Sequence, residues 1–568
     1  MDIKEAFKID GFNVIDSCKI NAHTGYAAES ISAVNHLNGK KKRAYYIEGS
    51  PDEMGYQMGF LGHAEIKQMV KEFPRETISG FLDPAMSPVL KDIIIDFLLF
   101  FIRESIYTFI DDIPFEYVQE AHGMVRGLHK ADPTAVGIQF EDIWILNVGI
   151  DVLMANLSSP PKFLQAIADS PEVKKQKYKP KIEDFKIPHF CNAYSAFGSA
   201  VEKPDTHFFG RDWMFNGGNT LENCAALIIT KPTGGRKPLV YAGAPGFIGA
   251  ALAMNMDGVA MGVDLVSAAN ANPSRPGFNS ILLVRHCIHR CDSAETVSQT
   301  VIKAKRGAPY IYPVSDGKSN KACIIEAGMK TANLDPLSYA SDDVKAYLPN
   351  KAFLNANAEA PQEGLFVRWN TYQQPAIFMK NYNKGLFEHF GKKYSPDVWG
   401  ADGLVFKEPF ADPNAFGFYF FSPLRQDKAD YILTTNSWVH PPMNICSMGE
   451  FTNTFSKLYW SDPQWRYDML NEVIRGFYGK FNWETAWRTI NYQSPSTGEG
   501  DGKKYYVIEG SPWKLPIVKY TDKDGKPQST WRVDGMTNLC ELRTAKKMRS
   551  LYGTYADDYV EITLPNYV

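Results

Sequence analysis

The clearest structural signal in the sequence is the stretch CNAYSAFGSAVEKPDTHFFGRDWMF, from Cys191 to Phe215. Small and apolar residues follow Cys191, the turn signal PDT stands in the middle, and a second strand-like run ends in Arg211 and Asp212. Two such runs on either side of a turn predict an antiparallel hairpin. A hairpin of this length brings Cys191 back beside Arg211 and Asp212. These three residue types together suit acyl transfer.

Further short strand-like runs follow the hairpin, and the turn signals PTGG and MDG separate them. Helical patterns cover about residues 277–305, where Asp292-Ser293 caps the second half, and about residues 462–490. Upstream, apolar residues recur at helical spacing from residue 55 to about residue 130, so this part is predicted to be mainly helical. Strands in runs with helices between them predict an α+β protein and not a βαβ repeat.

A change of character at residues 158–186 divides the chain. SSPPK is followed by VKKQKYKPKIEDFK, which carries six Lys beside one Glu and one Asp. We expect a solvated linker here, and a role of the lysines in binding an anion or a membrane is the alternative.

The composition excludes several classes of protein. With 568 residues, 44% of them hydrophobic and 22% charged, the chain is globular and not disordered. Because 61 Lys and Arg stand against 64 Asp and Glu, we do not expect nucleic acid as a partner. The most apolar run, Ile93 to Ile102, is broken by Asp96 and is shorter than the ~20 residues of a membrane span, so it predicts a buried helix and no integral membrane segment.

The N-terminus and the cysteines indicate in which cellular compartment the protein is expected. MDIKEAFKIDGFNVID has no uninterrupted apolar run and does not resemble a signal peptide, which predicts a cytoplasmic protein. A chain whose export signal had been removed would look the same, so export stays open. Eight scattered cysteines do not make a disulfide scaffold.

Motifs of several other enzyme classes are absent or incomplete. The sequence contains no GxSxG, HExxH or P-loop pattern, and GAPGFIG at residues 243–249 has the wrong spacing for a dinucleotide site. His286, Cys287, His289 and Cys291 cannot all converge on one metal from a single helix. The stretch DKDG at residues 522–525 lacks the other ligands of a calcium loop and predicts a hairpin turn. We therefore expect neither a metal nor a cofactor.

Four motifs together resemble the N-terminal nucleophile hydrolases of the choloylglycine hydrolase and peptidase C45 group, which includes acyl-coenzyme A:6-aminopenicillanate acyltransferase. They are Cys191 followed by FGRDW, NMDGVAMGVDL (Asn255–Leu265), SDGKSNKACIIEAG (Ser315–Gly328) and ILTTNSW (Ile432–Trp438). EGSPDEMGYQMG in the front region, Glu48 to Gly59, also resembles the C45 precursors.

This resemblance implies a four-layer αββα sandwich preceded by a mainly helical prosegment. It implies that the chain cuts itself between Phe190 and Cys191, which leaves associated chains of residues 1–190 and 191–568. Cys191 then becomes the new N-terminus. The polar segment before it suits a cut, because exposed and flexible segments are where chains are cleaved.

Cys191 would supply both the nucleophile and its base. A thiol with a pKa of ~8.5 is mostly protonated at neutral pH, and an α-amine with a pKa of ~7.7–8 can accept its proton. Arg211 would place positive charge beside the sulfur, and Asp212 would hydrogen-bond the α-ammonium. Relatives carry this acid three residues after the Arg, where Met214 stands here, so a different role for Asp212 stays open.

Three further residues take their roles from the resemblance. The amide of Asn436 is expected to donate to the oxyanion, with a backbone N–H near Asp264 as a second donor. Asp264 stands where relatives have Asn, and an ionised carboxylate cannot donate. Arg466 corresponds to a late arginine that supports the nucleophile.

The sequence thus predicts a hydrolase or acyltransferase that acts on non-peptide linear amides of small molecules through a thioester on Cys191. The two cleaved chains would associate, and a homo-oligomer is possible. One alternative is a phospholipase B-like ester hydrolase of the same fold, and the other is a binding protein that has lost catalysis. In the plain structural reading Cys191 is a small buried hydrophobe, Arg211 and Asp212 form a surface pair, and Asn436 ends a strand.

Overall fold

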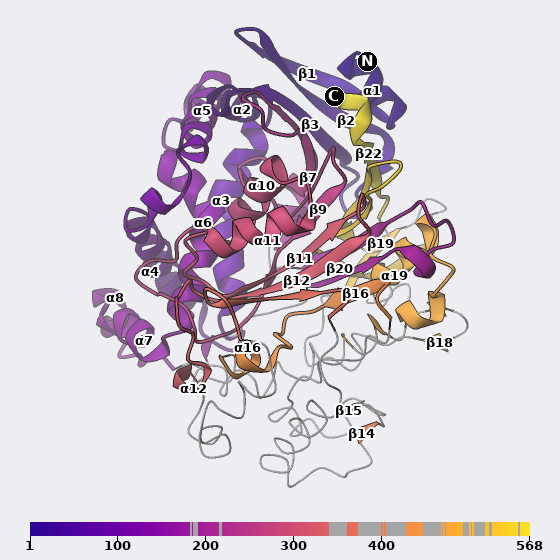
Figure 1. Ribbon diagram of the computed structural model, residues 1–568. Coiled ribbons are helices and arrows are strands. Elements are labelled where there is room, and N and C mark those ends of the chain that lie inside the picture. Colours follow the sequence, from indigo (N-terminus) through magenta and orange to yellow (C-terminus); the bar gives the residue numbers. More distant parts are fainter. Residues whose placement is uncertain are drawn as a thin grey trace.

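The computed structural model describes sixteen parts of the chain. They are residues 1–181, 184–185, 191–214, 218–339, 360–372, 399–400, 403–404, 428–446, 467, 470–471, 473–491, 499–500, 503–504, 517–521, 525–554 and 557–568. Within them the protein is α+β, as the alternation of strand and helix patterns predicts (Figure 1).

The larger of two main sheets has eleven strands, which are antiparallel except for one pair. Its order is β1 (Phe12–Ile20), β2 (His23–Val34), β3 (Lys41–Gly49), β6 (Ala226–Pro232), β7 (Leu239–Gly243), β8 (Leu252–Asn255), β9 (Val259–Gly262), β11 (Tyr310–Asp316), β12 (Lys321–Ala327) and β13 (Leu365–Trp369), with β10 (Asp264–Leu265) beside β11. The NMDG turn joins β8 to β9 as predicted.

The smaller sheet has seven antiparallel strands and carries the hairpin that begins at Cys191. Its order is β16 (Tyr431–Thr434), β4 (Asn192–Ala196), β5 (Phe208–Met214), β20 (Pro527–Glu541), β21 (Lys547–Thr554) and β22 (Val560–Thr563), with β19 (Ile517–Thr521) beside β20. Two short strand pairs stand apart, β14 (Trp399–Gly400) with β15 (Gly403–Leu404) and β17 (Glu499–Gly500) with β18 (Lys503–Lys504).

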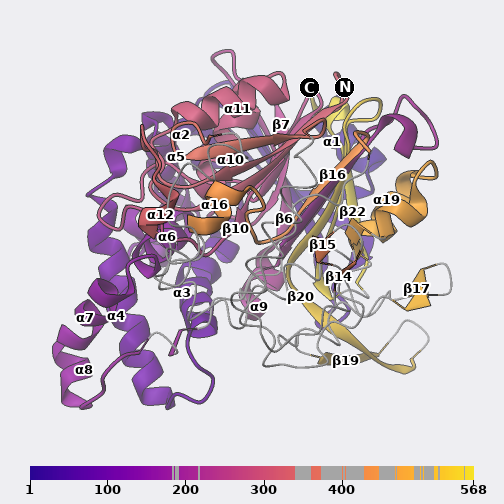
Figure 2. The ribbon, with the colours of Figure 1, turned by 60° about the horizontal axis from the view of Figure 1, so that its bottom comes forward.

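The smaller sheet buries both of its faces. Ala193 and Phe209 belong to the core that also contains the strands of the larger sheet, whereas Tyr194 and Phe208 pack with the helix α19 (Trp483–Asn491) on the other face. This alternation follows from the two-residue period of strand side chains. Figure 2 shows α19 on one side of the sheets and the N-terminal helices on the other.

Helices α10 (Ser280–Arg290) and α11 (Ala294–Lys303) pack on strands of the larger sheet. The sequence predicts one helical region with a cap at Asp292-Ser293, and Ser293 does begin the second helix, where its hydroxyl accepts a hydrogen bond from the Thr296 N–H. The remaining short helices are α9 (Gly218–Cys224), α12 (Pro336–Tyr339), α16 (Pro441–Cys446) and the 3₁₀ turns Ile110–Asp112, Pro133–Ala135, Gly198–Ala200 and Leu564–Tyr567.

The first fifty residues differ from the helical prosegment that the sequence predicts. After α1 (Ile3–Ile9) they form β1, β2 and β3, and β3 pairs in parallel with β6 from Arg43↔Ala226 to Gly49↔Pro232. The aromatic and branched run AYYI favours a strand, and its partner lies beyond the proposed cut. The front of the chain is therefore part of the larger sheet and not a separate layer.

Helices follow from residue 51 onward, as the helical spacing predicts. They are α2 (Pro51–Leu61), α3 (His63–Phe81), α4 (Pro88–Ile106), α5 (Phe115–Ala131), α6 (Phe140–Leu157), α7 (Pro160–Asp169) and α8 (Pro171–Lys175). The expected linker thus holds two short helices. Pro160 and Pro171 stand in their first turns, where proline is preorganised for a helix, so the prolines begin helices here instead of breaking them.

Helices α2 and α5 approach each other closely through four glycines. A Cβ on Gly55 or Gly59 would lie 2.0 Å from a carbonyl oxygen of α5, and a Cβ on Gly123 or Gly127 would lie 2.2 or 2.0 Å from one of α2. Only glycine fits such a contact between backbones. This pair fixes the helical layer against the sheet, because α2 also contacts β1, β2 and β3.

Candidate active site

Cys191 precedes the first residue of β4, and β5 lies beside it. The register pairs Ala193 with Arg211 and Asn192 with Asp212, which is the hairpin that the sequence predicts. Cys191 is 1% exposed and belongs to the core between the two sheets, together with Ala193 and Trp213. Its side chain therefore faces the larger sheet.

Asn436 connects Cys191 to the larger sheet. It lies just after β16, whose Thr434 pairs with Ala193 of β4. Its Oδ1 accepts a hydrogen bond from the Cys191 backbone N–H at 2.9 Å, and its Nδ2 donates to the Leu265 carbonyl at 2.8 Å. The amide N–H₂ that was expected to serve an oxyanion thus contacts a backbone carbonyl, while the amide oxygen holds the nitrogen of the candidate nucleophile.

Arg211 and Asp264 form a buried ion pair between the sheets. Oδ1 of Asp264 lies 3.1 Å from Nε and 3.0 Å from Nη2 of Arg211, and both side chains are fully buried. Arg211 Nη2 also donates to the carbonyl of Val263. Asp264 therefore compensates the charge of Arg211. Arg211 Nη1 is buried without a hydrogen-bond partner in the described part of the chain.

Asp212 lies on the other face of β5 from Arg211. Side chains alternate along a strand, and Asp212 is paired with Asn192, whose neighbour Tyr194 packs on the α19 side. Burial, with a smaller effect of the Asp212 charge, raises the pKa of Tyr194 well above its usual value. Of the two adjacent residues only Arg211 shares the face of the Cys191 side chain, so the expected role of Asp212 at the α-amine stays a prediction.

Glu326 holds the loop that contains Asn436. Its carboxylate accepts hydrogen bonds from the backbone N–H groups of Val439 at 2.9 Å and of His440 at 3.0 Å. Burial raises the pKa of Glu326 to about 7, and Arg368 acts in the opposite direction. The strand motif SDGKSNKACIIEAG therefore ends in a buried Glu that fixes the Asn436 loop.

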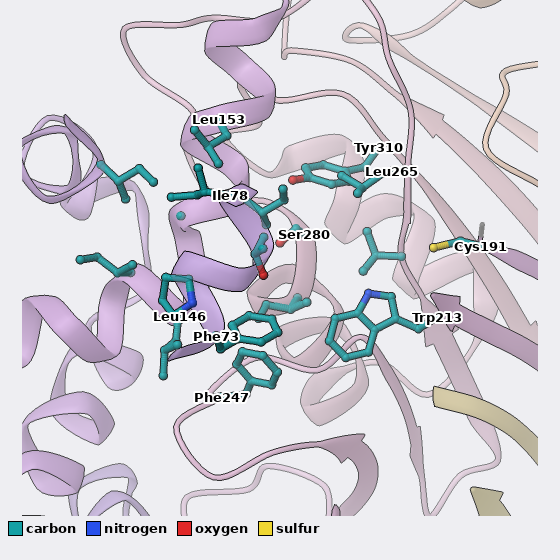
Figure 3. A pocket seen from close by; sticks show the side chains of 18 residues that line it. Phe73, Ile78, Leu146, Leu153, Cys191, Trp213, Phe247, Leu265, Ser280 and Tyr310 are labelled. Carbon is teal, nitrogen blue, oxygen red and sulfur yellow. The ribbon is translucent and has the colours of Figure 1, made fainter. Parts of the chain in front are cut away.

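A pocket lies beside Cys191 (Figure 3). Its wall is mostly apolar, and ten of its 18 lining residues precede Cys191 in the chain. These ten come from α3 (Phe73, Pro74, Thr77 and Ile78), α4 (Ile102) and α6 (Ile145, Leu146, Gly149, Ile150 and Leu153). The sulfur of Cys191 points toward Trp213 and Leu265 at one end, and Phe73 and Leu146 lie at the other (Figure 3). Sequence reasoning missed these helical residues, because their apolar pattern is that of any core helix.

The loop GAPGFIG fixes α6 to the rest of the site. Asn147 of α6 donates to the carbonyl of Gly246 at 2.9 Å and accepts from the N–H groups of Ile248 at 2.7 Å and Gly249 at 3.0 Å. Phe247 of this loop lines the pocket. The glycine-rich loop thus positions a pocket wall.

Two expected residues, Phe190 and Arg466, lie outside the described residues. In the described part of the chain no three His, Cys, Asp or Glu side chains gather in a way that could hold a metal ion. No single helix among the described residues has both the length and the apolar character of a membrane span.

Comparisons with other proteins give one relative at high coverage. An uncharacterized protein of Archaeoglobus fulgidus is 30% identical over 551 residues, which cover 97% of this chain and 68% of that protein. No model of a known protein family matches the chain.

Solved structures give distant similarities. A mutant conjugated bile acid hydrolase of Clostridium perfringens matches with a TM-score of 0.28 and 10% identity, covering 67% of this chain and 94% of that one. A penicillin V acylase of Agrobacterium tumefaciens matches with a TM-score of 0.27 and 9% identity, covering 65% of this chain and 84% of that one.

Proposed function

This chain belongs to one family with the uncharacterized protein of Archaeoglobus fulgidus, and we propose that it is a self-processing cysteine hydrolase or acyltransferase of linear amides. The observation that carries the proposal is the position of one thiol. Of the eight cysteines, all within the described residues, Cys191 is the one that lines the apolar pocket. Its backbone nitrogen is at the same time held by a buried amide.

Activation is the first step of the proposed mechanism. Hydrolysis of the peptide bond between Phe190 and Cys191 consumes one water and converts the Cys191 backbone N–H into a free α-amine. Asn436 Oδ1, 2.9 Å from that nitrogen in the uncut chain, is placed to accept a hydrogen bond from the new amine. In the proposal Asn436 therefore orients the amine, while a backbone N–H serves the oxyanion.

The catalytic cycle runs through a thioester. The α-amine takes the thiol proton, and the sulfur attacks the carbonyl carbon of the substrate. As the C–N bond breaks, the α-ammonium returns a proton to the leaving nitrogen. Water, or a second amine, then attacks the thioester and releases the acyl group. Arg211 lies on the Cys191 face of the hairpin but is paired with Asp264, so in the proposal the α-amine activates the thiol.

The pocket supports an apolar acyl group as the recognised part of the substrate. Most of its wall is apolar, as is usual for sites that bind the apolar part of a small molecule. The amine half of the substrate would lie beyond the sulfur, away from the helical wall.

In the proposed enzyme the segment before Cys191 contributes to the substrate pocket and to the larger sheet. It supplies ten of the 18 pocket residues, and β3 pairs with β6 across the cut. Lys42 and Asp557 add a fully buried ion pair of 2.8 Å between the two halves. The two cleaved chains would therefore stay associated, in a four-layer αββα arrangement.

Gel electrophoresis and N-terminal sequencing of the purified protein test this proposal. We expect two bands, of 190 and 378 residues, the second beginning CNAY. Cys191→Ala should remain a single inactive chain, whereas Cys224→Ala, which removes another buried thiol, should be cleaved and active. An intact chain whose amidase activity survives Cys191→Ala would overturn the proposal.

Two alternatives are distinguished in the same preparation. Faster hydrolysis of lysophospholipid esters than of acyl amides would identify a phospholipase B-like ester hydrolase. A binding protein that has lost catalysis is suggested by the neutralisation of Arg211 by Asp264. In that case Cys191 would react with a small alkylating agent no faster than the other seven cysteines.

A further inference from the structure

The apolar pocket contains one polar cluster, formed by Ser280, Tyr310 and Asp151. Ser280 and Tyr310 line the pocket, and Asp151 lies behind them on α6. The Tyr310 hydroxyl donates to Asp151 Oδ1 at 2.5 Å. All three side chains are at least 98% buried. In Figure 3 the hydroxyl groups of Ser280 and Tyr310 lie between Cys191 at one end and Leu146 at the other.

Ser280 is held in an unusual backbone conformation. Its φ is +39°, in the left-handed region that residues with a Cβ rarely adopt, and its N–H donates to the Tyr312 hydroxyl at 3.1 Å. Such strain is concentrated at functional sites. The conformation presents the Ser280 hydroxyl at the pocket wall.

The cluster has unused hydrogen-bonding capacity. In the described part of the chain neither Ser280 Oγ nor Asp151 Oδ2 has a hydrogen bond of ordinary geometry, and both atoms are buried. Burial raises the pKa of Asp151 to about 7, although the nearby Tyr310 and Ser280 hydroxyls act in the opposite direction. An unpaired polar group in an apolar wall is destabilising unless a ligand pairs it.

We propose that Ser280, Tyr310 and Asp151 form a polar subsite that recognises a hydroxyl group carried partway along an otherwise apolar acyl group. This inference rests on the proposed function, because the pocket is taken as the acyl site. A hydroxyl both donates and accepts, so it matches the Ser280 hydroxyl and the Tyr310–Asp151 pair behind it. The substrate class is therefore a hydroxylated acyl amide, with its carbonyl at Cys191.

Kinetics on matched substrates test the subsite. Two acyl amides are compared that differ only in a mid-chain hydroxyl. We expect wild-type protein to favour the hydroxylated one by about 10-fold or more in kcat/KM. In Ser280→Ala and in Asp151→Asn this preference should be lost, because kcat/KM should fall about 10-fold further for the hydroxylated substrate than for the plain one. Thr77→Val removes another hydroxyl that lines the pocket, from α3, and should change kcat/KM for both substrates by the same factor.

A binding experiment separates this inference from the proposed chemistry. The Cys191→Ala variant and the Cys191→Ala, Ser280→Ala double variant are each titrated calorimetrically with the two free carboxylic acids, one hydroxylated and one not. Preference for the hydroxy acid that Ser280→Ala abolishes supports the subsite even if no amide is ever hydrolysed. Amide hydrolysis with equal preference for both acyl groups would overturn the subsite and leave the proposed function standing. A failure of both acids to bind would overturn the subsite as well.

Discussion

Asn436 Oδ1 accepts a hydrogen bond from the backbone N–H of Cys191 at 2.9 Å, although the two residues lie 245 positions apart in the chain. The same side chain donates to Leu265, so one amide joins β4, the loop after β16 and β10. A fixed nitrogen in a buried site is what a nucleophile needs if its own amine is to serve as the base.

Replacing Asn436 should therefore impair both self-cleavage and turnover. We expect Asn436→Ala to lower kcat by about 10²-fold, in the range found for the loss of one preorganised polar group in an active site. Asn444→Ala is the matched control, because Asn444 of α16 is also buried but donates to the Trp438 carbonyl and not to Leu265. Cleavage is followed on gels and turnover by amine release. Equal effects of the two variants would show that Asn436 acts only by supporting the fold.

The ion pair of Arg211 and Asp264 gives a prediction on stability. Removing one partner of a buried pair leaves an uncompensated charge, so Asp264→Ala should lower the free energy of unfolding by about 3–5 kcal/mol. Asp96→Ala breaks the exposed pair of Arg75 and Asp96, 2.6 Å long, and should cost less than about 1 kcal/mol. Urea denaturation at neutral pH measures both. Loss of less than about 1 kcal/mol in Asp264→Ala would contradict the role of this pair in joining the sheets.

Local patterns predicted the hairpin of the site well. The strands β4 and β5 pair as the two strand-like runs predict, and Ser293 begins α11 because a serine followed by a helical pattern is a cap signal. The two-residue period of strands also shows why Arg211 and Asp212, as neighbours, cannot both point at the sulfur.

Long-range partners could not be predicted from one sequence. The apolar spacing of α3 and α6 is the same whether these helices fill a core or wall a pocket, so Phe73 and Leu146 gave no signal. The sequence pattern assigns the strand β3 to a helical prosegment, since nothing local indicates that its partner is β6. The position of Asn436 near Cys191 could be expected, but which of its amide atoms faces Cys191 depends on Leu265 across the sheets.

The close contact of α2 and α5 predicts a strict requirement for glycine. Gly123→Ala would place a Cβ 2.2 Å from the Asp52 carbonyl oxygen, so the helices must separate, and we expect a loss of about 1–3 kcal/mol or more. Gly137→Ala is the control, because a Cβ at that residue would meet nothing within 4 Å. The midpoints of urea denaturation of the two variants are compared with that of wild type. Similar midpoints would mean that the two helices are not packed backbone to backbone in solution.

Narrowing the pocket from the N-terminal side should change the preferred acyl length. Leu153→Trp on α6 fills part of the pocket, so we expect kcat/KM for long acyl amides to fall by about 10-fold or more relative to short ones. Phe100→Trp enlarges a side chain that is 62% exposed on α4 and should leave the length preference unchanged. An unchanged preference in Leu153→Trp would place the acyl group elsewhere.

Because burial raises the pKa of Asp151, we expect the stability of the protein to depend on pH. The pKa of this carboxyl is raised by burial from 3.8 to about 7, so between these pH values the folded protein holds a proton that the unfolded chain has released. The free energy of unfolding therefore falls as the pH rises from about 4 to about 7, by at most on the order of 4 kcal/mol for this group. Glu326, whose pKa burial also raises to about 7, contributes in the same direction.

Urea denaturation at several pH values should show a shallower fall in the free energy of unfolding in Asp151→Asn than in wild type, and the exposed control Asp92→Asn should match wild type. A fall of the same steepness in Asp151→Asn would mean that Asp151 is ionised in the folded protein across this range, and that its carboxylate is paired more fully than Tyr310 alone provides.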